Sequence, residues 1–325
     1  MSFNLAGLPL ELIFEILRLG ATPALAVDCN NRILEEDIYS CARALALVCS
    51  NVRQVVMPHL LHTVVLNSDR SLNLFLRTLK IQISWARQGS RLRLNYTELV
   101  RHIWSSACYE PLLLQHNWAY PSYDLLWNIF RNSQTIGFNF AAIHLLYEVI
   151  TATPYNTTFN DWTCSRVTFA GYIPRWNAIT SNSRGMEFLQ QITHLTVWAP
   201  HHDIASPQPE GVIPNWFYKL PFQFIPRLQK LSFTLVGPQD APTTPVLIYT
   251  LPSSDNGTPA DTFQTWARSS DPLSWGQVFH LNVPYRVDVN VDMDARDLAY
   301  KWEMAYYLGQ NDVWSPSATQ QLRQQ

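Results

Sequence analysis

Apolar positions near the N-terminus recur at the three- and four-residue spacing of helices. The first predicted helix begins at Pro9, which suits the first helical turn, and ends before Gly20 and Pro23. Its apolar residues are predicted to share one face, opposite Glu11, Glu15 and Arg18; they are Leu12, Ile13, Ile16 and Leu17. The pattern indicates an amphipathic helix.

Two further helices are predicted after a polar connection over residues 20–37. The second covers about residues 38–49. Ser50 or Asn51 caps the third, which is expected to end by Pro58 because proline disfavours a helical residue before it. Together the three helices predict a compact N-terminal unit.

Beyond residue 60, a different spacing repeats, with apolar residues at relative positions one, four and six. The copies begin at Leu61, Cys164, Ile192, Leu228 and Val278, with weaker copies around residues 100–103 and 246–251. Helical spacing follows several copies, for example at residues 72–83, 125–130 and 143–150. Alternation of short strands with helices is typical of leucine-rich-repeat units, here of irregular length. An unrelated α/β arrangement is the alternative, because many sheets contain alternating apolar residues.

The C-terminal third is predicted to contain long loops at residues 200–214 and 238–259, which are rich in proline and small polar residues. Val287, Val289 and Val291 alternate as in a last strand. A helical stripe that includes Leu298 and Trp302 is expected to close the end of the repeats.

Composition indicates a folded chain without the charge of a nucleic-acid-binding protein. Of the 325 residues, 47% are hydrophobic and 12 are Trp, while the net charge is −2. The nearest basic cluster, formed by Arg87, Arg91, Arg93 and Arg101, is interpreted as a solvated face. No uncharged stretch reaches the roughly 20 residues that span a bilayer, so a membrane is not expected as a partner.

Local signatures of common enzymes and metal sites are missing from the sequence. The five cysteines include no C-x-x-C pair and are expected to be reduced thiols. His201, His202 and Asp203 form the one tight group of potential metal ligands, and no further ligands lie at a suitable spacing. His194 is interpreted as a surface histidine of a strand, and Asp292 and Asp294 as solvated turn residues. We therefore expect no cofactor and no enzymatic activity.

The order of motifs in the first fifth of the chain resembles the F-box, a small helical module that binds an adaptor protein. The matching motifs are Leu8-Pro9 before the first helix, Leu45 with Val48-Cys49 and Arg53, and Pro58 with Leu61. With its repeat-like remainder, the chain looks like mushroom-type fungal F-box proteins. In that family these helices dock on a Skp-type adaptor. The resemblance implies adaptor-binding roles for Leu8, Pro9, Leu12, Ile13, Ile16, Leu17, Leu45, Val48, Cys49, Val52, Arg53, Pro58, Leu60 and Leu61.

The resemblance predicts an α/β protein in two parts: a three-helix F-box over residues 5–62 and an irregular leucine-rich-repeat-like α/β solenoid over residues 63–325. It implies a non-catalytic substrate receptor of an SCF-type ubiquitin ligase, linked through the adaptor to a cullin, in the cytoplasm or nucleus. The target protein is not predicted. One alternative is a protein-binding repeat scaffold without ligase coupling. Another is a hydrolase whose Ser, His and Asp residues converge only in space.

Overall fold

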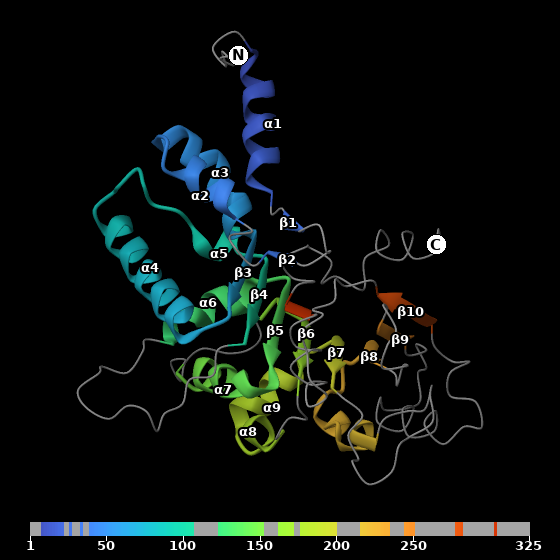
Figure 1. Ribbon diagram of the computed structural model, residues 1–325. Coiled ribbons are helices and arrows are strands. Elements are labelled where there is room, and N and C mark those ends of the chain that lie inside the picture. Colours follow the sequence, from blue (N-terminus) through green and yellow to red (C-terminus); the bar gives the residue numbers. More distant parts are fainter. Residues whose placement is uncertain are drawn as a thin grey trace.

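The structure is a computed structural model of the full chain. It describes residues 8–22, 26–27, 33–34, 39–106, 123–152, 162–171, 176–199, 215–234, 244–250, 277–281 and 302–303. These residues form N-terminal helices and a mixed α/β region with a large sheet (Figure 1).

Three helices lie at the N-terminus: α1 (Leu10–Ala21), α2 (Ser40–Ala46) and α3 (Ser50–His62). Glu11 in the first turn of α1 and Arg18 in its last turn both suit the helix dipole. The prediction that the third helix ends by Pro58 is wrong, because α3 continues through this proline to His62. Burial of Met57 and Leu61 on either side of the proline outweighs its local preference.

The connection between α1 and α2 contains a short antiparallel pair that the sequence did not predict. Strands β1 (Ala26–Val27) and β2 (Ile33–Leu34) pair with each other and not with the large sheet.

The main sheet has eight strands in the order β10-β9-β8-β7-β6-β5-β4-β3. Its parallel part consists of β3 (Thr63–Leu66), β4 (His102–Ser105), β5 (Thr135–Asn139), β6 (Arg166–Ala170), β7 (His194–Trp198) and β8 (Lys230–Thr234). Each of these six strands pairs with the next one along the chain. The predicted alternation of strands and helices is therefore confirmed as a mixed α/β fold with a parallel sheet.

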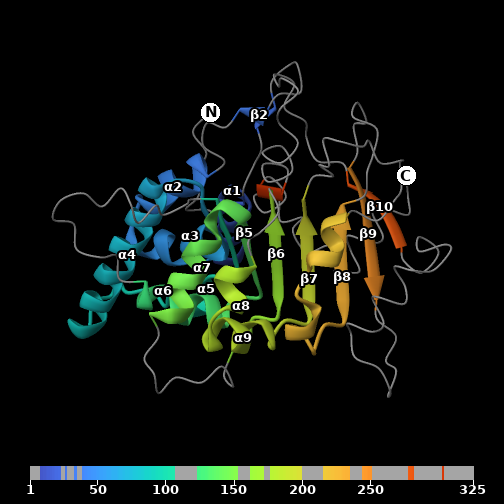
Figure 2. The ribbon, with the colours of Figure 1, turned by 90° about the horizontal axis from the view of Figure 1, so that it is seen from below.

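Helices connect the parallel strands and cover one face of the sheet (Figures 1 and 2). They are α4 (Asp69–Arg87), α5 (Tyr96–Leu99), α6 (Asp124–Asn132), α7 (Ile143–Thr151), α8 (Asn177–Thr180) and α9 (Ser183–Leu189), with single 3-10 turns η3 (Phe140–Ala142), η5 (Asn215–Lys219) and η6 (Phe222–Phe224). One cluster of buried side chains continues from Leu17 in α1 to Phe233 in β8. Because α3 ends at His62 and β3 begins at Thr63, the helices and the sheet adjoin without a linker.

The one-four-six spacing explains how each parallel strand packs. Residues at positions four and six, such as Val167 and Phe169 in β6, enter the core, and position one is a buried residue just before the strand. Strand β5 follows the same rule with Ser133 at position one, where its hydroxyl donates to the Ile129 carbonyl at 2.7 Å. The sequence did not reveal β5 because a serine replaces the expected apolar residue.

Strands β9 (Thr244–Thr250) and β10 (Gln277–Leu281) were predicted as further copies of the same unit. They are strands of the same sheet, but β9 runs antiparallel to β8, and β10 runs antiparallel to β9. The spacing of apolar residues records alternation between two faces, not strand direction. The predicted strand at residues 287–291 lies outside the described residues.

Candidate protein-binding surfaces

Helix α1 has two apolar faces, whereas the sequence predicted one. Ile13 and Leu17 face the α2 and α3 side, where Leu17 is buried and Ile13 packs on the core. Leu12, Ile16 and Leu19, spaced by four and three residues, point away from it and define the α1 stripe. The four residues predicted to share one face are therefore divided: Ile13 and Leu17 pack on the core, whereas Leu12 and Ile16 are exposed.

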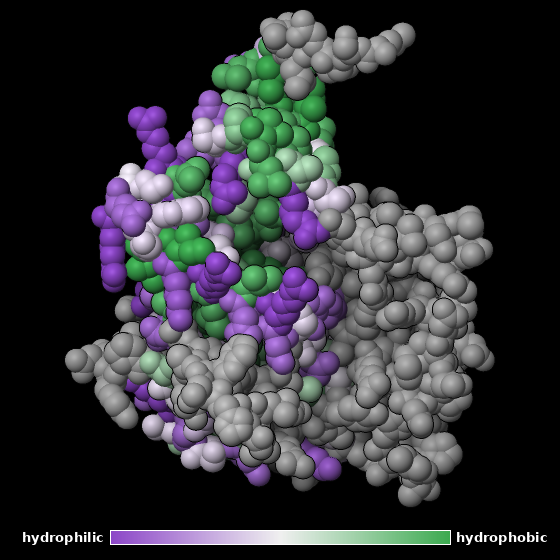
Figure 3. Space-filling model, turned by 60° about the vertical axis from the view of Figure 1, so that its left-hand side comes forward, coloured by the Kyte–Doolittle hydropathy of each residue, from purple (hydrophilic) through white to green (hydrophobic). Residues whose placement is uncertain are grey.

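The α1 stripe is strongly exposed for an apolar surface. Leu12 is 51% exposed, Ile16 43% and Leu19 63%. Leu10 and Phe14 add further exposed apolar area, because the N-terminal half of α1 projects from the rest of the molecule (Figure 1). Figure 3 shows the resulting hydrophobic surface gathered over this helix. Contiguous exposed apolar surface of this kind indicates a binding site for another molecule.

The connection between α2 and α3 exposes a second, smaller apolar site. Leu47 is 83% exposed and Val48 65%. Cys49 is also exposed and occupies the position before α3, without a side-chain cap. Val48 and Cys49 are thus accessible residues of the predicted adaptor site.

The remaining predicted adaptor residues differ widely in exposure. Pro9 is exposed and precedes α1. Leu61 is buried, as Leu17 is, and both offer little surface to a partner. The half-buried members are Leu8, Leu45, Val52, Arg53, Pro58 and Leu60, of which Leu45, Val52 and Leu60 pack against the core. The accessible part of the predicted site is therefore Pro9, Leu12, Ile16, Val48 and Cys49.

Four exposed apolar residues near these positions were not predicted as site residues: Leu10, Phe14, Leu19 and Leu47. A sequence signal existed for α1, since apolar residues occupy more of this helix than one buried face requires. No comparable periodicity marks Leu47, which lies between two helices.

The sheet face opposite the helices carries polar and cationic side chains. Strand register places His102, Thr135, Arg166, His194 and Lys230 side by side at the beginning of their strands. Burial lowers the pKa of His102 to about 4, and nearby His62, Arg166 and Arg101 act in the same direction. The described residues that perturb His102 thus create a positive electrostatic environment at this edge.

Further along the same face, a C-terminal pair of residues covers the sheet. The Glu303 carboxylate accepts hydrogen bonds from Trp104 Nε1 at 3.1 Å and from Ser106 Oγ at 3.0 Å. Trp302 is fully buried, with its ring centroid 4.3 Å from that of Trp198. The predicted stripe around Trp302 was expected to close the end of the repeats; its described part instead packs on the face of the sheet.

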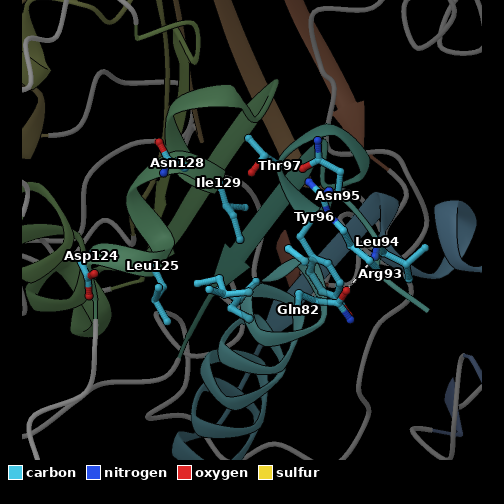
Figure 4. A pocket seen from close by; sticks show the side chains of 13 residues that line it. Gln82, Arg93, Leu94, Asn95, Tyr96, Thr97, Asp124, Leu125, Asn128 and Ile129 are labelled. Atoms are coloured by element: carbon cyan, nitrogen blue, oxygen red, sulfur yellow. Dashed lines mark hydrogen bonds between the residues drawn. The ribbon is translucent and has the colours of Figure 1, made fainter. Parts of the chain in front are cut away.

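A pocket of about 270 Å³ lies between the end of α4, the segment before α5, and α6 (Figure 4). Leu79, Leu125 and Ile129 contribute apolar surface, whereas Asn95 and Asn128 contribute side-chain amides. Asp124 and Arg93 lie at opposite ends of the pocket in Figure 4. The pocket therefore offers mixed apolar and amide surface, with its ionisable groups far apart.

The structure gives little support for metal binding among the residues it describes. No group of three His, Cys, Asp or Glu side chains there is arranged to hold an ion. His201, His202, Asp203, Asp292 and Asp294 lie outside these residues. His194 Nδ1 is 2.8 Å from Thr193 Oγ1, and Cys164 is buried with its thiol pKa raised by burial to about 12.

Among the described helices, none combines the length and the apolar character needed to cross a bilayer. Comparisons with protein-family models, with characterised proteins and with solved structures found no match to this chain.

Proposed function

We propose that this chain is the substrate-binding subunit of an SCF-type ubiquitin ligase. In this proposal α1–α3 form an F-box that binds a Skp-type adaptor and, through it, a cullin. The strands and helices after residue 62 form a leucine-rich-repeat-like solenoid that binds the target protein. The chain itself has no catalytic role.

The α1 stripe is the observation that carries the proposal. A helix that already packs Ile13 and Leu17 on the core needs no second apolar face for folding, so Leu12, Ile16 and Leu19 are available to a partner. Recognition by burial of such a face follows the i, i+4, i+7 pattern of helix-in-groove binding. Pro9 and Val48, which the F-box resemblance also assigns to the adaptor, are exposed as this function requires.

Buried members of the expected site have a supporting role. Leu17 and Leu61 belong to the core cluster that holds α1 and α3 in place. In the proposal they position the helices on which the exposed residues lie.

A pull-down with a purified Skp-type adaptor tests the proposal directly. The chain is expected to retain the adaptor as a control F-box protein does, and the combined change Pro9→Ala and Leu12→Asp is expected to abolish retention while leaving the sheet folded. Circular dichroism of the variant checks the fold. Absence of adaptor binding by the unmodified chain would leave the repeat scaffold without ligase coupling as the better description.

A further inference from the structure

Helix α4 and the loop after it display an unusual number of exposed cations. They are Arg70, Arg77, Lys80, Arg87, Arg91 and Arg93. None of the six forms an ion pair with a described residue. Residues 69–101 contain seven basic and two acidic residues in a chain whose net charge is −2. This segment therefore carries a local excess of positive charge, which favours an anionic partner.

Apolar side chains are exposed among these cations. Arg70, Leu74, Arg77 and Ile81 are spaced by four, three and four residues and follow one line along α4. Leu74 is 51% exposed and Ile81 37%, and in the loop Leu92 is 42% exposed between two arginines. We call the α4 members of this surface, with Lys80 and Arg87, the α4 outer face.

The opposite face of α4 is committed to the core. Leu72, Leu76 and Leu79 are buried there. A partner that wraps around a basic amphipathic helix therefore has no access to its main apolar face. Phosphate groups of a nucleic acid would use the cations but leave Leu74 and Ile81 in water.

The position of α4 suits a broad, flat partner. It follows β3, the edge strand of the sheet, and lies at the outside of the molecule (Figure 1). Figure 3 turns this side forward and shows hydrophilic and hydrophobic residues mixed on the surface beyond α1. A convex helix surface contacts a bilayer more readily than it contacts an extended peptide, which binds in a groove or along a strand edge.

We propose that the α4 outer face binds the surface of a membrane that contains anionic phospholipids. Arg70, Arg77, Lys80 and Arg87 contact lipid phosphates and carboxylates, while Leu74 and Ile81 enter the boundary between headgroups and acyl chains. Contact is peripheral and reversible. The expectation of no membrane partner rested on the lack of a spanning segment, which peripheral contact does not require. This inference goes beyond the proposed ligase function and does not depend on it.

Flotation of the full chain with lipid vesicles tests the inference. Binding is expected to vesicles of phosphatidylcholine and phosphatidylserine, not to phosphatidylcholine alone, and to weaken as salt is added. Arg77→Gln with Lys80→Gln is expected to reduce the affinity at least about tenfold. The matched pair Lys219→Gln with Arg227→Gln, which removes one lysine and one arginine from exposed positions elsewhere, is expected to bind as the unmodified chain does.

The apolar contribution is tested with Leu74→Ser and Ile81→Ser together. This pair is expected to lose vesicle binding but keep adaptor binding, whereas Leu12→Ser with Ile16→Ser is expected to do the reverse. Equal binding to neutral and anionic vesicles, or no binding to either, would overturn the inference. The inference would also be overturned if Arg77→Gln with Lys80→Gln lost vesicle binding while Leu74→Ser with Ile81→Ser bound fully. That result would indicate a general anion site for an acidic protein or a nucleic acid.

Discussion

Gly20 and Gly185 are both helical glycines, but their surroundings differ. A Cβ added to Gly20 in α1 would lie 3.4 Å from Leu45 Cδ1, an ordinary contact distance. A Cβ added to Gly185 in α9 would lie 1.9 Å from the Ile179 carbonyl oxygen, a backbone atom. The Gly185 amide also donates to Asn182 Oδ1 at 2.6 Å, which caps the helix. Close approach of α8 and α9 therefore requires glycine at position 185.

The two glycines give opposite predictions for the same substitution. Gly185→Ala is expected to lower the free energy of unfolding by about 2 kcal/mol or more, because helices α8 and α9 must move apart to make room for the added methyl group. Gly20→Ala is expected to be neutral or to raise it by up to about 1 kcal/mol through better helix propensity. Urea unfolding measures both, and equal effects of the two changes would contradict the packing described at α8 and α9.

Because the pKa of His102 is lowered, the free energy of unfolding is expected to fall in acid. Its folded-state pKa of about 4 lies below the ordinary value of 6.5, so the unfolded chain binds the proton first as the pH falls. The stabilising effect of a neutral His102 is complete above pH 6.5 and is lost as the pH falls towards 4. Between pH 7 and pH 5 the loss is about 2 kcal/mol.

The change His102→Asn isolates this contribution, because the other titrating groups remain. The variant is expected to lose about 2 kcal/mol less between pH 7 and pH 5 than the unmodified chain in urea unfolding. An identical pH dependence of the two proteins would show that His102 titrates normally in the folded state.

At the scale of elements, sequence periodicity predicted five of the six parallel strands and several of the helices, but not strand direction or which helix faces are exposed. Strand β5 was not predicted because Ser133 occupies a position that is apolar in the other copies. The Ser133 hydroxyl is accommodated there by donating a hydrogen bond to the Ile129 carbonyl. Pro58 suggested a helix end that tertiary burial overrides. Alternation predicted β9 as a strand but could not show that it runs antiparallel to β8.

The candidate site was predictable in location and not in detail. Leu12 and Ile13 are adjacent apolar residues with the same helical pattern, yet one is exposed and the other packs on the core. The difference depends on where α2 and α3 lie, which is a tertiary property. The cations of α4 were visible in the sequence, but the structure was needed to show that they form no ion pair with a described residue and that they align with Leu74 and Ile81.

At the scale of the whole molecule, residues distant in sequence hold the sheet from its polar face. Trp302 packs against Trp198 in β7, and the adjacent Glu303 accepts a hydrogen bond from Trp104 in β4. Trp302→Ala is expected to lower the free energy of unfolding by about 3 to 5 kcal/mol, as truncation of a large buried aromatic side chain does. Glu303→Gln, which keeps an acceptor oxygen, is expected to cost about 1 kcal/mol in the same denaturation experiment. If Trp302→Ala destabilised the protein less than Glu303→Gln does, the packing of Trp302 on Trp198 would have no structural role.

Titration of a purified Skp-type adaptor into three forms of the full chain tests whether the α1 stripe binds the adaptor. Leu12 and Leu74 are both helical leucines with 51% exposure, so Leu12→Asp and Leu74→Asp are matched changes on α1 and α4. Leu12→Asp is expected to weaken adaptor binding at least about thirtyfold, since a central apolar contact contributes roughly 2 kcal/mol. Leu74→Asp is expected to bind as the unmodified chain does. Unchanged affinity of Leu12→Asp, or no measurable binding by the unmodified chain, would contradict the assignment of the α1 stripe to a ligase adaptor.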